Sequence, residues 1–408
     1  MTLAIRSAAL VLMISSGCFA SRDRDNGAPE EVIETPDGFL CTVGTTGVVD
    51  GRSYLGDPWV YNGYVYFHRQ TPELGQRVYR LDPRTGEETR LTAAEQATER
   101  MLAVGERGVL IEQGLPSHEY PILVVRDPSG ERVIDDLFGT RCAVLGSRFA
   151  AWFSYEGAGT LRWLDFDSGE TRDIDGPTIT CPIMTDGTRV LWRSYIDGAS
   201  VIEHTDGRSV SRITGRVGHS SQIWGRTVLS ITEDGSVWAM ELDSAGARQL
   251  HAGPCTATEW TPLSTGQTVR CGEDSDLVVF DGANLRAIPS TRPQVQAAAF
   301  ADGLIVFSEF AGREPDDYGE GIHTGFVRAS RGDGGPMMTL GRAAEMGWVG
   351  CGPPESERMV FDGRVAAWNY GLGPSEQPDP AERWSLSSQI GYAIVSCEEE
   401  EPWANPGS

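Results

Sequence analysis

The sequence contains no lysine. All 34 basic residues are arginines, and 58 aspartate and glutamate residues outnumber them, which leaves a formal net charge of −24 at pH 7. A surface this acidic repels phosphate groups and anionic lipid headgroups. We therefore expect no nucleic-acid partner and no direct contact with a membrane surface, and the charge itself helps to keep the surface soluble.

Long apolar runs with helical periodicity are also absent. The chain is instead rich in glycine (49) and proline (23), and aromatic residues make up 9% of it. This composition favours many short strands separated by turns. A chain of 408 residues is long for one compact domain unless it forms a closed or repetitive β architecture.

Recognisable catalytic and metal-binding motifs are missing too. The sequence has no Gly-x-Ser-x-Gly, no His-Glu-x-x-His, no glycine-rich phosphate loop, no EF-hand spacing and no Cys-x-x-Cys. None of the six histidines has a histidine four residues away. The sequence therefore predicts no catalytic residue, no bound metal and no cofactor.

The first twenty residues differ from the rest of the chain. Arg6 precedes the short apolar run Ala8–Ile14, and small residues lead to Cys18. This pattern is typical of an export signal, and the run is too short to span a bilayer as a helix. Ser-Ser-Gly before Cys18 resembles the box of bacterial lipoproteins, although Ser15 stands where that motif prefers leucine. Cleavage after Ala20 is the alternative.

These features predict the organisation of the chain ends. We expect a lipoprotein-type signal peptide over 1–20, a disordered polar tether over 21–38 and an acidic, polar tail over 399–408. A lipid on Cys18 would be the only membrane attachment of a monomer in the cell envelope, facing the periplasm or the cell surface. Ordinary cleavage would instead release a soluble periplasmic or secreted protein.

One hairpin pattern recurs along the chain. The stretch Val78–Thr92 predicts two antiparallel strands joined by a turn at Asp82–Gly86, because apolar and polar residues alternate on both sides of it. Related hairpins follow at 122–134, 161–174, 201–213, 237–250, 277–288 and 325–340. A marker turn with glycine or a small residue, followed by a β-rich run, precedes each hairpin. Aromatic residues that end these runs, such as Phe67 and Trp152, are expected to form the core.

The marker turns define a repeat. Successive turns lie 37 to 45 residues apart, except for a last step of 60. Four strands at this period are typical of a β-propeller blade. We therefore predict an all-β propeller of eight four-stranded blades over 39–398, with seven blades as the alternative. The strands 39–43 and 390–397 have no complete blade of their own and are expected to close the ring together.

The amino-acid sequence of the hairpins also supports a family resemblance. Leu81–Thr92 (LDPRTGEETRLT), and next Leu164–Ile174, resemble the propeller repeat of TolB-type periplasmic proteins, a PD40-type, WD40-like repeat. The resemblance covers most of 53–340 and implies a propeller in the cell envelope. Quinoprotein repeats are similar but place tryptophan where these copies have leucine or isoleucine. That difference argues against a pyrroloquinoline quinone enzyme.

Cysteine usage fits an oxidising compartment. Eight cysteines are present, and setting Cys18 aside leaves seven, enough for three disulfides and one spare thiol at Cys351. We predict three pairs, namely Cys41–Cys397 across the ring-closing strands, Cys142–Cys181 at equivalent inner-strand positions of neighbouring blades, and Cys255–Cys271 across one hairpin.

Loop lengths single out one part of the ring. Loops between the second and third strands of all blades emerge on one face, and they are predicted to be short in blades three to six. In blades seven, eight, one and two they are longer, at 309–324, 369–389, 68–77 and 112–120. These blades are consecutive once the ring closes, and binding commonly occurs on loops of a rigid scaffold. The candidate binding residues are Asp316, Asp317, Tyr318, Tyr370, Trp384, His68, His118 and Tyr120.

Aromatic rings beside carboxylates suit a peptide, a glycan or a cation. We therefore expect a non-catalytic scaffold that binds an envelope protein or glycan through this face. The alternative is an envelope hydrolase or lyase, which would need His68, His118 or His323 beside the carboxylates. Insertions in surface loops are also tolerated without any function.

Overall fold

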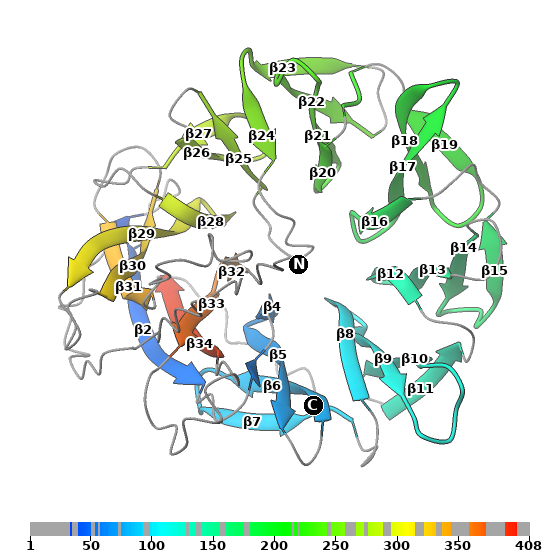
Figure 1. Cartoon of the computed structure of the whole chain (residues 1–408), viewed down its shortest axis with the longest axis horizontal. Coiled ribbons are helices and arrows are strands. Elements are labelled where there is room, and N and C mark those ends of the chain that lie inside the picture. Colours follow the sequence, from blue (N-terminus) through cyan, green and yellow to red (C-terminus); the bar gives the residue numbers. More distant parts are fainter. Residues whose placement is uncertain are drawn as a thin grey trace, which may run out of the picture.

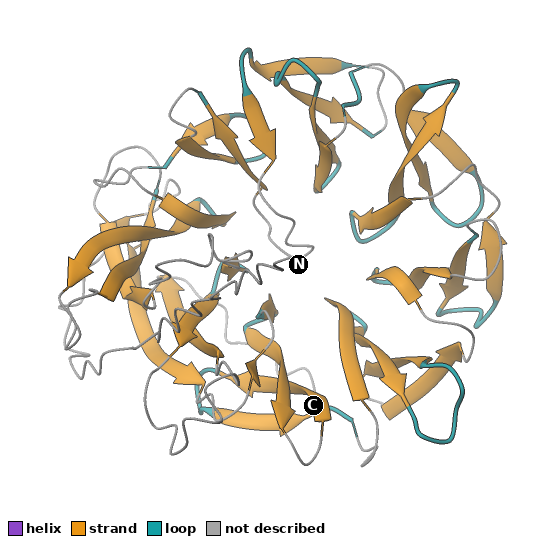
Figure 2. Cartoon of the chain, viewed as in Figure 1, coloured by secondary structure: helices purple, strands orange, loops and turns teal. Residues whose placement is uncertain are grey.

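The computed structural model of the chain is a ring of eight antiparallel β-sheets (Figure 1). The part of the chain that the structure describes contains strands and loops and no helix (Figure 2). The described residues are 33–34, 40–49, 54–55, 58–71, 75–92, 98–127, 130–135, 140–154, 160–174, 180–213, 216–218, 220–242, 246–257, 267–272, 276–288, 295–314, 322–331, 337–343, 359–372 and 388–397. The predicted all-β propeller with eight blades is confirmed.

Each blade is an antiparallel meander. Blade 1 contains β3 (Tyr54–Leu55), β4 (Trp59–Tyr61), β5 (Tyr64–Thr71), β6 (Gly75–Asp82) and β7 (Glu87–Arg90). Blade 2 contains β8 (Thr98–Gly105), β9 (Gly108–Gly114), β10 (Ile122–Asp127) and β11 (Gly130–Asp135). Blade 3 contains β12 (Thr140–Leu145), β13 (Phe149–Ser154), β14 (Leu161–Asp165) and β15 (Thr171–Ile174). Blade 4 contains β16 (Thr180–Thr185), β17 (Val190–Ile196), β18 (Ala199–Thr205) and β19 (Val210–Ile213).

The second half of the ring repeats this plan. Blade 5 contains β20 (Ser220–Trp224), β21 (Thr227–Ile231), β22 (Val237–Glu241) and β23 (Ala247–His251). Blade 6 contains β24 (Cys255–Ala257), β25 (Gln267–Cys271), β26 (Asp276–Phe280) and β27 (Leu285–Ala287). Blade 7 contains β28 (Val295–Ala301), β29 (Leu304–Glu314), β30 (Ile322–Ser330) and β31 (Met337–Ala343). Blade 8 contains β32 (Met359–Phe361), β33 (Val365–Leu372), β34 (Ser388–Cys397), β2 (Leu40–Val49) and β1 (Ile33–Glu34).

Both ends of the chain contribute to blade 8. Strand β2 pairs with β34 from Cys41↔Cys397 to Val49↔Ile390, and in Figure 1 the blue β2 lies in the same part of the ring as the orange and red β33 and β34. A disulfide joins Cys41 to Cys397 across 356 residues of sequence. The predicted ring closure and its disulfide are therefore confirmed.

Other predictions about the chain ends concern residues that are mostly not described. The short strand β1 falls inside 21–38, the predicted tether. The remainder of that segment, the predicted signal peptide with Cys18, and the tail 399–408 lie outside the described residues. Over the residues that were described, no helix has the length and apolar character needed to cross a membrane.

Turn chemistry explains the recurring hairpin. In the β6–β7 turn, the carbonyl of Asp82 accepts the N–H of Gly86 at 2.8 Å, and the Asp82 carboxylate accepts the N–H of Arg84 at 3.0 Å. Gly86 has a φ of 71°, which residues with a side chain rarely adopt. The β14–β15 turn repeats this arrangement, with Gly169 N–H donating to the Asp165 carbonyl at 2.8 Å. The aspartate and glycine of the repeat are therefore needed to form the turn.

The hydrophobic core lies in the seams between neighbouring blades. The cluster between blades 3 and 4 contains Trp163 and Trp192, and the ring of Phe149 stacks on that of Trp163 with centroids 3.9 Å apart. Phe67 is fully buried and Trp152 is 1% exposed, which confirms that the aromatic residues ending the second strands belong to the core. Burial of each phenylalanine contributes about 1.5–3 kcal/mol.

The turns between first and second strands link neighbouring blades on one face of the ring. Arg107 in blade 2 donates from Nε to the carbonyl of Ser147 in blade 3 at 2.7 Å, and Ser147 N–H donates to the carbonyl of Gly187 in blade 4 at 3.1 Å. Across the closure, Gly63 N–H donates to the Asp362 carboxylate at 2.7 Å. The connections between second and third strands emerge on the opposite face, because successive strands are antiparallel.

Candidate functional site

The connections between second and third strands differ in length around the ring. In blade 7 the β29–β30 ladder runs from Ile305↔Ser330 to Glu314↔Ile322, whereas the β21–β22 ladder of blade 5 ends at Ile231↔Val237. At about 3.4 Å per residue, the blade 7 hairpin extends on the order of 17 Å further along the strands. In blade 8, β33 and β34 are also long, at 8 and 10 residues. We refer to the face with these connections as the hairpin face.

The long connection predicted for blade 1 is a hairpin rather than a loop. Residues 68–71 and 75–77 continue the β5–β6 ladder, which ends only at Thr71↔Gly75. Blade 4 reaches a similar length, because β17–β18 ends at Ile196↔Ala199 around Asp197. The predicted contrast between these two blades is therefore absent. In blade 1 the polar residues 68–71 continue the strand, and a polar strand is easily mistaken for a loop in a sequence.

The structure describes only part of the predicted binding group. Asp316, Asp317, Tyr318 and Trp384 lie outside the described residues, and Tyr370 lies in β33 with only its backbone described. His68 lies in β5 of blade 1. His118 and Tyr120 lie in the connection between β9 and β10 of blade 2, and both are exposed, Tyr120 by 38%. The described members of the group thus come from adjacent blades.

His68 links blades 1 and 2. Its Nε2 accepts a hydrogen bond from the backbone N–H of Met101 in β8 at 2.5 Å. Accepting this bond requires an unprotonated Nε2. The lone pair that a general base would use at this nitrogen is therefore engaged with the backbone, and His68 contributes to the seam between the blades.

His118 has a different environment. Its Nδ1 lies 3.0 Å from the hydroxyl oxygen of Ser117, and its backbone N–H donates to the carbonyl of Leu115 at 3.0 Å. The ring is exposed to solvent. Such an arrangement suits hydrogen bonding to a ligand on the hairpin face.

A buried polar cluster lies in the same seam as His68, and the sequence did not predict it. The carboxylate of Glu99, which is fully buried, accepts the N–H of Val78 at 3.0 Å and the hydroxyl of Thr92. Burial raises the pKa of Glu99, while the hydrogen bonds from Thr92 and Val78 and the charges of Arg77 and Arg90 oppose this shift. Because glutamate and arginine are usually exposed, a pattern of charged residues does not reveal a buried cluster.

Beside this cluster, Gln113 lies directly opposite Glu99 in the β8–β9 ladder. Its side chain is 1% exposed, and its amide nitrogen has no hydrogen-bond partner among the described residues. A buried donor without an acceptor costs about 1–3 kcal/mol.

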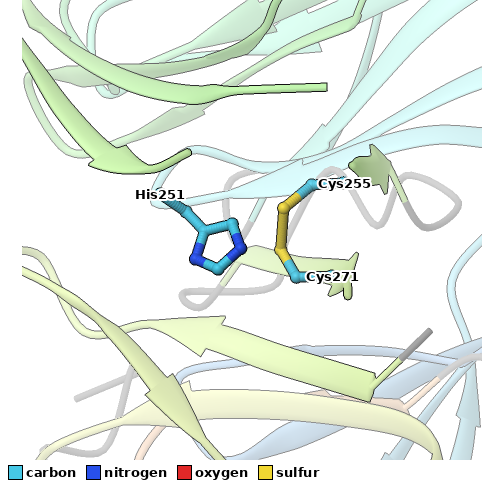
Figure 3. A group of neighbouring side chains, drawn as sticks. All are labelled: His251, Cys255 and Cys271. Atoms are coloured by element: carbon cyan, nitrogen blue, oxygen red, sulfur yellow. A yellow bond between two sulfur atoms is a disulfide. The ribbon is translucent and has the colours of Figure 1, made fainter. Parts of the chain in front are cut away.

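One further group of side chains has metal-binding chemistry. His251, Cys255 and Cys271 place their donor atoms within 4.8 Å of one another (Figure 3). The two cysteines form a disulfide, as do Cys142 and Cys181 in the inner strands of blades 3 and 4. Both predicted pairs are confirmed. The sequence signal for the histidine was its position four residues before Cys255.

Comparisons with known proteins give only distant likenesses. No protein family model and no curated protein matches the sequence. Among solved structures, the chain is similar to the β-propeller domain of the Trilobed protease from Pyrococcus furiosus, with a TM-score of 0.45 and 12% identity over 78% of this chain and 91% of that one. An oligogalacturonate lyase in complex with manganese gives a TM-score of 0.45 and 12% identity over 90% and 96%. A puromycin hydrolase gives 0.42 and 15% over 81% and 60%.

Likenesses at these TM-scores carry no argument about function. The assignment of the protein as a β-propeller rests on its own sheet topology. This topology has eight blades, and both chain ends contribute to the last one.

Proposed function

We propose that the protein is an exported, lipid-anchored propeller that binds an envelope protein or glycan through its hairpin face and performs no catalysis itself. The observation that carries this proposal is the extension of the hairpins in blades 7 and 8, two neighbours in the ring, far beyond the ladder of blade 5. Hairpins that leave the core add polar surface and unpaired strand edges, which a partner can contact.

The scaffold beneath this face is rigid. Eight hydrophobic clusters occupy the seams between blades. One disulfide joins blades 3 and 4, a second closes the ring within blade 8, and a third lies within blade 6. A rigid scaffold lowers the entropic cost of ordering a binding surface. The proposal therefore needs no large rearrangement when the partner binds.

The proposed location follows from covalent chemistry. Three disulfides suit an oxidising, extracellular-type compartment. The export signal with Cys18 and the resemblance of Leu81–Thr92 to the TolB-type repeat add the cell envelope and the lipid anchor to this proposal.

The partner chemistry is proposed from the side chains at the long connections. Tyr120 is an exposed aromatic ring on the hairpin face, next to the exposed His118. Asp316, Asp317 and Tyr318 lie in the sequence between β29 and β30, and Trp384 lies between β33 and β34. Aromatic rings beside carboxylates bind sugars, cations and peptide side chains.

The test is affinity capture from envelope extracts. Replacing Pro315–Gly321 by Asn-Gly joins the paired residues Glu314 and Ile322 by a two-residue turn and removes the acidic and aromatic residues between them. We expect this variant and Tyr120→Ala to lose the captured partner. Tyr195→Ala is the matched control, because Tyr195 is an exposed aromatic residue (52%) of the blade 4 hairpin, on the far side of the ring. Equal loss with Tyr195→Ala would contradict the proposed site.

A second measurement addresses the alternative of a propeller hydrolase or lyase. Alanine at His323, which is not a member of the proposed binding group, is expected to leave partner capture and the cellular role of the protein intact. Loss of the cellular role with unchanged capture and normal folding would favour catalysis on the hairpin face.

A further inference from the structure

Three side chains from adjoining blades bring soft donor atoms together away from the predicted binding residues. His251 ends β23 in blade 5, Cys255 begins β24 and Cys271 ends β25 in blade 6 (Figure 3). The cysteines are 4% and 6% exposed and the histidine is half-buried. In the described part of the chain, no other group of three histidine, cysteine, aspartate or glutamate side chains lies this close together.

The backbone holds the two cysteines in place independently of the bond between their sulfur atoms. Cys255 N–H donates to the carbonyl of Gly235 at 3.0 Å, and Gly272 N–H donates to the carbonyl of Pro254 at 3.1 Å. In the β24–β25 ladder, Cys255 lies directly opposite Cys271. Opening the disulfide therefore leaves both sulfur atoms facing each other beside the imidazole.

Close packing adds to this support. A Cβ atom at Gly235 would lie 2.7 Å from the Cα of Pro254, so the turn of blade 5 rests directly on the segment that carries Cys255. The hydrogen bonds and this packing come from two blades. The position of the cysteines is thus fixed by contacts between blades 5 and 6 and not by one hairpin alone.

We propose that reduction of the Cys255–Cys271 disulfide converts this corner into a three-ligand site for a thiophilic metal ion such as Zn²⁺. A dithiol reductant supplies two electrons and two protons, its own sulfur atoms form a disulfide, and the Cys255–Cys271 bond opens to two thiols. Metal binding then releases both protons and uses two thiolates and a neutral His251 nitrogen. A fourth position stays open to water or another ligand.

One feature separates this disulfide from the others. Neither Cys41–Cys397 nor Cys142–Cys181 belongs to a three-residue group of metal-binding side chains in the described residues. The corner also lies on the hairpin face, because Gly235 and Gly272 belong to the connections between second and third strands of blades 5 and 6. The inference is independent of the proposed partner and gives the same face a second, redox-dependent ligand.

The test uses the full chain before and after treatment with dithiothreitol, followed by removal of the reductant under inert gas and titration with Zn²⁺ against a chromophoric chelator. We expect the reduced protein to take up one tightly bound zinc ion and the oxidised protein none. With Co²⁺, the reduced protein should show a thiolate-to-cobalt charge-transfer band. Thiol alkylation and peptide mass mapping report which disulfide has opened.

Variants assign the ligands. Cys255→Ser/Cys271→Ser should abolish zinc uptake. His251→Asn, which keeps the disulfide and so preserves folding, should weaken binding by more than the roughly 10–100-fold that loss of an outer-sphere partner costs. His118→Asn, an exposed histidine elsewhere on the face, should bind like the wild type.

Three results would overturn the proposal. These are a Cys255–Cys271 bond that the dithiol does not open in the folded protein, zinc uptake no greater than that of the double serine variant, and unchanged affinity in His251→Asn.

Discussion

The carboxylate of Glu99 in blade 2 accepts the backbone N–H of Val78 in blade 1 at 3.0 Å. The same carboxylate accepts the hydroxyl of Thr92, which follows the outer strand of blade 1. One buried side chain of blade 2 thus contacts the two ends of the hairpin on which the repeat was recognised. The seam between these blades therefore contains buried polar contacts as well as apolar ones.

Glu99 predicts an unusual pH dependence. Its pKa is raised in the folded protein, chiefly by burial, so the folded state holds the proton to higher pH than the unfolded state. Its contribution to stability is therefore complete below the unfolded pKa and is lost as pH rises through the folded pKa. Because glutamine mimics the protonated carboxyl, the denaturation midpoints of wild type and Glu99→Gln should lie closest together in acid, and the wild type should fall below the variant as pH rises through the folded pKa. Midpoints that converge as pH rises would contradict this.

Asp82, in the same hairpin, should affect the pH dependence of folding stability in the opposite direction. Hydrogen bonds from the guanidinium of Arg84, the largest cause, lower the pKa of its carboxyl. The contribution of Asp82 is present above the unfolded pKa and is lost as pH falls through the folded pKa. Asp82→Ala should therefore destabilise the protein at neutral pH and have a smaller effect in acid. The measurement is the denaturation midpoint as a function of pH, and equal losses at both pH values would refute the assignment.

The effects on stability of substituting Glu203, a buried carboxylate in blade 4, and its partner Arg212 should be strongly coupled. Glu203 is 1% exposed and accepts hydrogen bonds from Ser194 at 2.7 Å, Trp192 at 3.2 Å and Arg212 at 2.8 Å. Arg212→Met leaves this charge without its cation and should cost on the order of 3 kcal/mol. Glu203→Gln/Arg212→Met should recover part of that loss in chemical denaturation. A double variant as unstable as the sum of the two single variants would contradict the coupling.

Alanine substitution of two glycines with similar backbone conformation should lower stability by different amounts. Gly86 has a φ of 71°, and a Cβ added to it would have nothing within 4 Å, whereas Gly207 has a φ of 84° and an added Cβ would lie 2.5 Å from Cε2 of Trp163. Gly86→Ala should cost about 1–2 kcal/mol from backbone strain alone. Gly207→Ala should cost more, since it also displaces a buried indole. Equal denaturation midpoints for the two variants would contradict this.

The disulfides predict an order of stabilities. Under the chain-entropy account, a loop of 356 residues (Cys41–Cys397) gains about 6 kcal/mol from cross-linking and a loop of 16 (Cys255–Cys271) about 3 kcal/mol. Cys41→Ser/Cys397→Ser should therefore lower the thermal midpoint more than Cys255→Ser/Cys271→Ser, as measured by calorimetry. The reverse order would show that strain or residual structure outweighs loop entropy.

Much of the fold could be predicted because its signals are local. The aspartate and glycine of Asp82–Gly86 are needed by the turn itself, so each copy of the turn marks a blade. The ring closure could be predicted from two strands without a blade, each carrying a cysteine. The turn signals can be recognised in the sequence because each depends only on neighbouring residues.

The site could be predicted only in part, for physical reasons. Residues 68–71 are polar although they continue a strand, and polarity in a sequence does not distinguish a strand from a loop. Glu99 is buried by residues of another blade, and the burial of a single charged residue cannot be recognised from the sequence. His251 precedes Cys255 by only four residues, but its position near Cys271 depends on how blade 5 packs against blade 6, which spacing along the chain does not show.

The bond between Cys41 and Cys397 has a mechanical consequence. Cys41 stands near the beginning of β2, where the chain from the proposed lipid anchor enters the ring, and Cys397 ends β34. Tension on the anchored end therefore reaches β34 through a covalent bond, before it can peel β2 from the sheet one hydrogen bond at a time. A propeller held to a membrane at one end and to a partner on its hairpin face would keep its ring closed under load.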